Sequence, residues 1–143
     1  MSKNVSYLTQ IARCSGLHCN RQTEPLGISA RQSSLLLEIC ATPNISQDTL
    51  AKRVFLNKSV VARLLANLEE QGFVGRPVSQ TDKRTVCLHP TEKALQIAPQ
   101  LGEINAKWAA FLTSDMTEEE IETLESLLSR LQTRAADWSE VAE

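Results

Sequence analysis

Long apolar runs are missing from this chain of 143 residues, and no stretch approaches the run of about 20 apolar residues that spans a bilayer. The first residues also lack the apolar run of a signal peptide, so we expect the protein in the cytoplasm. Aromatic residues make up only 4% of the chain, which disfavours a large protein-binding hot spot. The motifs G-x-x-x-x-G-K-S/T, G-x-G-x-x-G, H-E-x-x-H and G-x-S-x-G are absent as well, and we expect no enzyme.

Cysteine is sparse and forms no pattern that is typical of a scaffold. The four cysteines make no C-x-x-C pair, and they are Cys14, Cys19, Cys40 and Cys87. In a chain without a secretion signal, free thiols are expected rather than disulfides or a zinc ribbon. Cys14 and His18 lie four residues apart on one helical face, which is too few ligands for a closed metal site. We therefore expect no bound metal and no cofactor.

Charge of one sign does not dominate the chain as a whole, because the formal net charge is −2. The distribution along the chain is uneven, however. Residues 47–93 carry eight Lys and Arg against five Asp and Glu, whereas residues 115–143 carry two against nine. A local basic patch attracts nucleic-acid phosphate even in an acidic protein, so the basic middle of the chain is compatible with a nucleic-acid partner.

Helical periodicity dominates the first half of the chain. Helices are expected over residues 5–22 and 29–41. Two short helices follow, the first over residues 47–54 and the second from the N-cap Asn57 to Gly72. The second short helix has an apolar face opposite a polar face whose start is cationic. This pair has the pattern of a helix-turn-helix, in which the second helix enters the major groove of DNA.

After the short helices the pattern changes to β. Residues 73–78 and 85–89 are expected to form two strands around a polar, basic tip, which would be a wing. A long helix follows, and Pro99 is expected to kink or interrupt it. The last helix carries a heptad seam of apolar residues, Ile121, Leu124, Leu128, Leu131, Ala135 and Trp138. The expected fold class is therefore mainly α, a winged helix-turn-helix with a two-stranded β-wing and long terminal helices.

Three stretches of this sequence carry a family resemblance. They are Pro25-Leu26-Gly27-Ile28-Ser29 before Gln32, the run from Leu50 through Arg63 to Val74, and Asp82-Lys83-Arg84 followed by Val86 and Thr91-Glu92-Lys93. With the order of the expected elements, they cover nearly the whole chain. They resemble the multiple-antibiotic-resistance regulator (MarR) family of bacterial DNA-binding transcriptional regulators, most of which are repressors.

The resemblance implies a homodimer that binds double-stranded DNA through one winged helix per subunit. Residues 1–143 would form a single domain of this type, with dimerisation helices in 1–28 and 99–143 and the DNA-binding region in 29–98. The first and last helices are expected to make the dimer contacts, through Leu8, Ile11, Ile121, Leu124, Leu128, Leu131 and Trp138. The two recognition helices would face successive major grooves about 34 Å apart and read a palindrome.

The recognition helix is expected to place its N-terminal side chains in the major groove. These side chains belong to Asn57, Lys58, Ser59, Ala62 and Arg63. Arg63 would hold a guanine in a bidentate contact, and Ala62 or Val60 would touch a thymine methyl group. Lys58 and the helix N-terminus would bind phosphate, which adds affinity without sequence information.

The wing supplies the remaining expected DNA contacts. Arg84 at its tip would enter a minor groove, where narrow A·T-rich steps attract arginine. The family resemblance implies that Asp82 orients Arg84. Arg76 and Lys83 are expected to contact the phosphate backbone.

Control of DNA binding is expected to come from a small effector, often an aromatic or phenolic acid in relatives. Such a ligand would bind between the dimer and DNA-binding regions, and it acts only through different affinities for two conformations. One alternative is a redox sensor that uses Cys14 or Cys19 near Arg13 and Arg21, with metal sensing at Cys14 and His18 as a lesser variant. An alternative of another class is a dimeric protein-interaction module that does not bind DNA.

Overall fold

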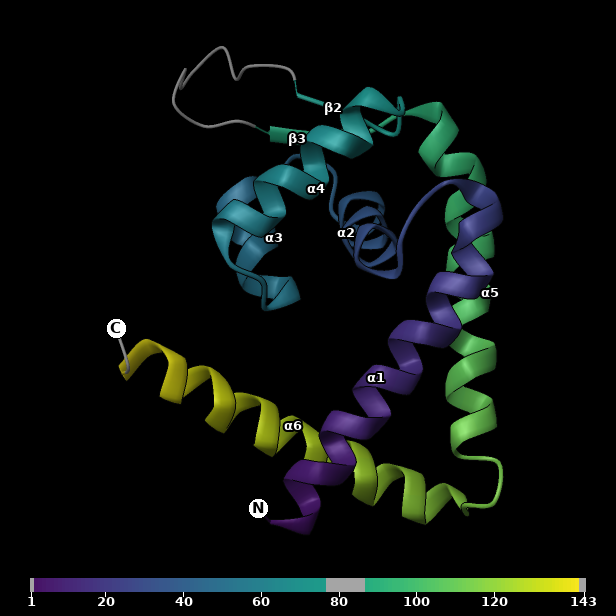
Figure 1. The fold of residues 1–143 in the computed structure, drawn as a ribbon, viewed down its shortest axis with the longest axis vertical. Helices are drawn as coiled ribbons and strands as arrows, with labels where there is room; N and C mark the ends of the chain where they lie inside the picture. The colour runs from purple at the N-terminus through teal and green to yellow at the C-terminus, as the bar shows by residue number, and fades with distance from the viewer. Residues whose placement is uncertain (1, 77–86, 142–143) are drawn as a thin grey trace. The chain divides into compact units, whose positions relative to one another are not determined.

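The computed structural model describes residues 2–76 and 87–141 and is dominated by helices (Figure 1). The elements in chain order are α1 (Lys3–Thr23), the 3-10 helix η1 (Glu24–Leu26), α2 (Ala30–Ala41), β1 (Ile45–Ser46), α3 (Gln47–Val54), α4 (Lys58–Glu70), β2 (Val74–Gly75), β3 (Cys87–Pro90), α5 (Glu92–Leu112) and α6 (Glu118–Val141). They form two compact units, Met1–Ala106 and Lys107–Glu143. In the described part of the chain, every helix is too short or too polar to cross a membrane.

The helix starts are fixed by local capping, as the sequence predicts. The Ser29 hydroxyl accepts from the Gln32 amide at 3.2 Å, and the Gln32 side chain accepts from the Ser29 amide at 2.9 Å, which forms a capping box. Thr117 and Glu120 form the same reciprocal pair at the start of α6. These contacts satisfy amide groups that have no partner within the helix.

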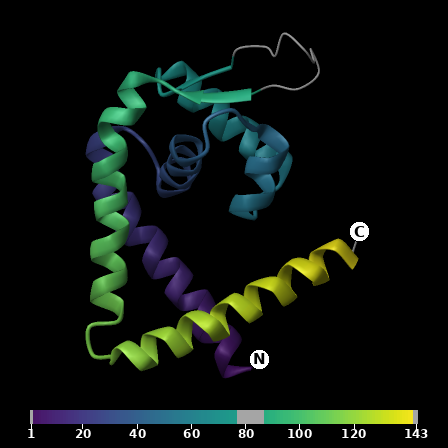
Figure 2. The same ribbon diagram turned by 180° about the vertical axis from the view of Figure 1, so that it is seen from behind.

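The core of the first unit is built around α2. Leu35, Leu36 and Ile39 of this helix are fully buried, and they belong to one cluster with apolar residues of α3, α4, α5 and the strands. Figure 1 and Figure 2 show α2 beside α3 from opposite sides. Burial of each such side chain contributes about 1.5–3 kcal/mol, so this cluster holds the helix-turn-helix rigid.

The small sheet has three strands in the order β1-β3-β2, which are the two predicted strands of the wing, β2 and β3, and one strand that the sequence did not predict. The additional strand, β1, pairs with β3 in antiparallel register, with Ile45 opposite Leu88. On the other side, Val74 of β2 lies opposite Pro90. A two-residue strand has no periodicity of its own, and only its distant partner β3 defines β1. The expected wing tip lies within residues 77–86, outside the described residues.

Helix α5 continues through Pro99, so of the two expected effects, a kink or an interruption, the interruption does not occur. Pro99 lacks the amide that would bond to the carbonyl of Leu95, one turn earlier. Both residues are exposed, so this carbonyl lies on a face where water is available. A single missing hydrogen bond on a solvated face bends a helix more readily than it ends it.

The second unit contains the end of α5 and all of α6. Trp108 and Phe111 stack within α5, with ring centroids 5.9 Å apart. Along α6 the predicted seam is incompletely covered. Ile121 and Leu124 are half-buried, whereas Leu128, Leu131 and Trp138 are exposed to 41%, 48% and 76%. A helix with this apolar stripe requires a partner surface.

Candidate nucleic-acid interface

The orientation of α4 follows from its apolar face. Val61, Leu65 and Leu68 are fully buried against the core, which is the face that the sequence predicts. The opposite face carries Arg63, which is exposed, while Ala62 between the faces is half-buried. Helix α4 therefore docks on its unit by one side and presents the other to solvent, as a recognition helix requires.

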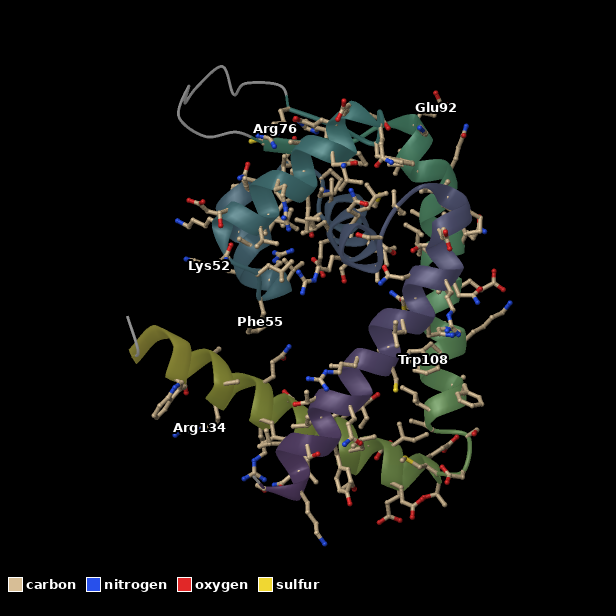
Figure 3. All side chains as sticks on the ribbon, in the orientation of Figure 1. Lys52, Phe55, Arg76, Glu92, Trp108 and Arg134 are labelled. Atoms are coloured by element: carbon tan, nitrogen blue, oxygen red, sulfur yellow. The ribbon has the colours of Figure 1, made fainter. Side chains whose placement is uncertain are left out.

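The turn between α3 and α4 is built on an unusual residue. Phe55 caps α3 with a left-handed backbone, φ 55°, and its side chain remains 57% exposed. Figure 3 shows Phe55 projecting from the end of the helix-turn-helix, on the side away from Arg76. A non-glycine residue in this conformation carries strain of about 1–2 kcal/mol. Glycine, which has no Cβ, would adopt this conformation without that strain.

Asn57 and Ser59, both predicted to contact DNA, are joined to each other in this structure. The Asn57 side chain accepts from the Val60 amide at 2.8 Å, and the Ser59 hydroxyl donates to the same Asn57 oxygen at 2.8 Å. Asn57 is thus the N-cap that the sequence predicts, and its carboxamide oxygen is occupied. Any contact of Asn57 with DNA would have to use its amide group.

Three cations of the winged helix face carboxylates of their own chain. Lys58 Nζ lies 3.6 Å from Asp48 Oδ1 in the first turn of α3. Arg76, at the base of the wing in Figure 3, pairs through Nε with Glu69 of α4. The third pair joins Arg53 of α3 to Glu38 of α2, and the same arginine donates to the Thr42 hydroxyl at 2.9 Å.

Two other cations of this region have no such partner. Within the described residues, neither Lys52 on α3 nor Arg63 on α4 has a carboxylate at ion-pair distance. Both side chains are exposed, and Figure 3 shows Lys52 pointing away from α3. The contact of the Arg63 guanidinium with a base edge stays a prediction.

The end of the recognition helix is anchored to the start of α5. Lys93 donates to the carbonyl of Gln71 at 2.6 Å and places its ammonium 4.4 Å from the centre of the Phe73 ring. The Thr91 hydroxyl donates to the Gly72 carbonyl at 2.6 Å. Gly72 itself has φ 80°, which is the left-handed C-terminal residue predicted for this helix. These contacts fix the position of α4 relative to the base of the wing.

Part of the predicted site lies outside the described residues. Asp82, Lys83 and Arg84 of the wing tip all fall there, and their roles remain predictions. Sequence reasoning missed Asp48 and Glu69, which pair with Lys58 and Arg76, and it missed the exposed Lys52 of α3. The acid in the first turn of α3 was visible in the sequence, but its pairing depends on how α3 and α4 pack.

The cysteines considered as sensors differ in environment. Cys14 is exposed, whereas Cys19 is half-buried and donates to the Asn105 side-chain oxygen over 4.0 Å. Burial raises the pKa of Cys19, the opposite direction to the lowered pKa that a reactive thiol requires. Within the described residues, no group of three or more His, Cys, Asp or Glu is placed to hold a metal ion.

A pocket of about 320 Å³ adjoins Cys19 in the first unit. It is lined by α1, α2, the turn between α3 and α4, and Asn105 of α5. Val54 and Leu56 bring apolar surface from both sides of Phe55, and Arg31 brings a positive charge from α2. The pocket volume is near the lower end of the range for small-molecule sites.

The solvated α4 face and the adjacent sheet together define a winged helix-turn-helix DNA-binding protein. A sequence profile described as MarR family matches residues 26–85. The chain is 30% identical over 142 residues to a Bacillus subtilis protein named "Uncharacterized HTH-type transcriptional regulator YybA", covering 99% of this chain and 95% of the relative. The chain belongs to the MarR family of transcriptional regulators, which bind DNA and are not enzymes.

Solved structures agree with this assignment. The structure titled as the transcriptional regulator SlyA matches with a TM-score of 0.96 at 24% identity, covering 99% of this chain and 100% of the other. A putative MarR family regulator from Listeria monocytogenes, complexed with 26mer DNA, matches with a TM-score of 0.92 at 26% identity. That match covers 96% of this chain and 91% of the regulator. The predicted fold class and the predicted family are thereby confirmed.

Proposed function

We propose that this regulator is a homodimeric repressor that binds a palindromic operator in the cytoplasm and is released by a small aromatic acid. The observation that carries the proposal is the solvated face of α4, where Arg63 is exposed and has no carboxylate partner among the described residues. A base-reading arginine needs this freedom, because a bidentate contact with guanine uses two of its donors.

The dimer is supported by apolar surface at both ends of the chain. On α1, Leu8 is exposed to 39% and Ile11 to 49%, and on α6, Leu128 and Leu131 are similarly exposed. Apolar side chains at helical spacing on an otherwise polar helix favour burial against another surface. A second copy of the same chain supplies it, and two-fold symmetry explains why the operator would be a palindrome.

The effector is assigned to the pocket beside Cys19. Arg31 offers a charge for a carboxylate, and Val54 and Leu56 offer apolar contacts for a ring. Val54 and Leu56 flank Phe55 in the turn between α3 and α4. A ligand in this pocket therefore touches the segment that sets the start of α4. Such a ligand lowers operator affinity if it binds the DNA-free conformation more tightly.

The test measures operator affinity with 2-hydroxybenzoate as the probe, on an operator selected from random DNA. Millimolar probe should weaken wild-type binding at least about fivefold, which is the low end of typical coupling between sites. Arg31→Gln should retain operator affinity and lose the response, while Arg21→Gln, an exposed arginine of α1 outside this pocket, should respond as wild type does. An unchanged response in Arg31→Gln would contradict the assignment of this pocket.

A further inference from the structure

We propose that Asp48 competes with DNA phosphate for Lys58 and thereby lowers the sequence-independent part of DNA affinity. The inference rests on the proposed placement of Lys58 at the DNA backbone. It assigns a role in DNA binding to an acidic residue, which would not be expected to contact a polyanion.

The geometry brings the two groups together from different helices. Asp48 lies in the first turn of α3, and Lys58 is the first residue of α4. The N-termini of the two helices are close enough that Lys58 Nζ lies 3.6 Å from Asp48 Oδ1. Lys58 is therefore neutralised at the same end of α4 that is expected to meet the DNA backbone.

The exposure of this pair makes it exchangeable. The Lys58 and Asp48 side chains are 71% and 70% exposed, so water and salt screen their attraction and they add little to stability. By contrast, the paired side chains of Arg76 and Glu69 are only 29% and 32% exposed. Phosphate can take Lys58 from Asp48 without breaking any buried contact, whereas Arg76 is held in place.

The exchange has a consequence for affinity at every DNA sequence. When Lys58 moves to a phosphate, the Asp48 carboxylate loses its partner. The free energy gained from the Lys58–phosphate contact is therefore reduced by the free energy of the lost Lys58–Asp48 ion pair. Arg63 has no acid partner in the described part of the chain, so no ion pair has to be broken before Arg63 contacts a base. Asp48 thus weakens backbone binding while it leaves base readout intact, and this limits occupancy of non-operator DNA.

The first measurement compares wild type with Asp48→Asn on random-sequence DNA over a range of salt concentrations. At 0.15 M salt, Asp48→Asn should bind about two- to fivefold more tightly for each subunit that contacts the DNA, the range expected for an exposed pair. The slope of log affinity against log salt should become steeper by up to about 0.9 for each subunit of the dimer, one additional phosphate charge per subunit. The matched control is Asp137→Asn, because Asp137 pairs with Arg134 on α6 at the same 3.6 Å and the net charge changes equally.

The second measurement asks whether Asp48 acts through Lys58. Lys58→Gln should weaken binding to operator and random DNA by the same factor, and Asp48→Asn should add nothing in the Lys58→Gln background. If Lys58→Gln leaves affinity unchanged, both the placement of Lys58 and this inference are wrong. If Lys58→Gln weakens binding but Asp48→Asn has no effect, or has an equal effect in both backgrounds, the placement stands and the competition is refuted.

Discussion

Arg63 and Arg76 illustrate what a sequence reveals about single residues in this regulator. Both were predicted to face DNA, one at the bases and one at the backbone. Helical spacing places Arg63 on the outer face of α4, and the structure has it exposed there. Arg76 pairs with Glu69, a partner seven residues back in α4 that only the folded chain brings close. The positions of the cations in the sequence therefore do not predict which of them pair with an acid of the same chain.

The thiols give a prediction at the same scale. Burial raises the pKa of Cys19 and of Cys40, so at pH 7.5 each carries less thiolate than an exposed cysteine. Iodoacetamide should therefore modify both more slowly in the native protein than in the urea-unfolded chain, as followed by peptide mass spectrometry. The difference between the modification rates of the native and the unfolded protein should narrow as pH rises through the raised pKa values. Native Cys19 reacting as fast as the unfolded chain would favour the oxidant-sensing alternative.

At the scale of elements, the sequence predicted most of what is determined locally. The bounds of α3 agree with the expected 47–54, and Asn57 and Ser29 cap their helices as expected. These features depend on hydrogen bonds within a few residues, which residue type and spacing reveal. Strand β1 was missed for the opposite reason, because its two residues are a strand only through pairing with β3.

Two glycines test whether the helix ends are set by backbone conformation. A Cβ would meet nothing within 4 Å at Gly72 or at Gly102, so contacts do not decide either substitution. Gly72 has φ 80°, and Gly72→Ala should lower the free energy of unfolding by about 1 kcal/mol. Gly102 lies inside α5, where alanine is the better helix former, and Gly102→Ala should raise that free energy by about 0.5–1 kcal/mol.

Urea denaturation of both variants measures these free energies. If the free energy of unfolding changes in the same direction in both variants, the left-handed conformation at Gly72 does not control the end of α4.

Across the whole molecule, reading a palindrome with two recognition helices requires a dimer. Leu131 of α6 is exposed to 48%, and Leu131→Glu should place a charge in the proposed subunit contact and produce monomers. The control is Leu95→Glu, because Leu95 of α5 is exposed to 52% and lies outside the predicted seam. Sedimentation velocity distinguishes the two variants, and circular dichroism verifies that both are folded. A folded Leu131→Glu dimer would place the interface elsewhere.

Selection of binding sites from a random double-stranded library tests most directly whether two copies of α4 read DNA through Arg63. Wild type should recover palindromic sites whose half-sites are about 10 base pairs apart, one turn of the duplex. Arg63→Ala should lose preference at one symmetric pair of positions, with about 1–3 kcal/mol less discrimination there. The exposed α6 arginine variant Arg134→Ala should recover the wild-type site. Asymmetric single sites, or an unchanged preference in Arg63→Ala, would contradict the account.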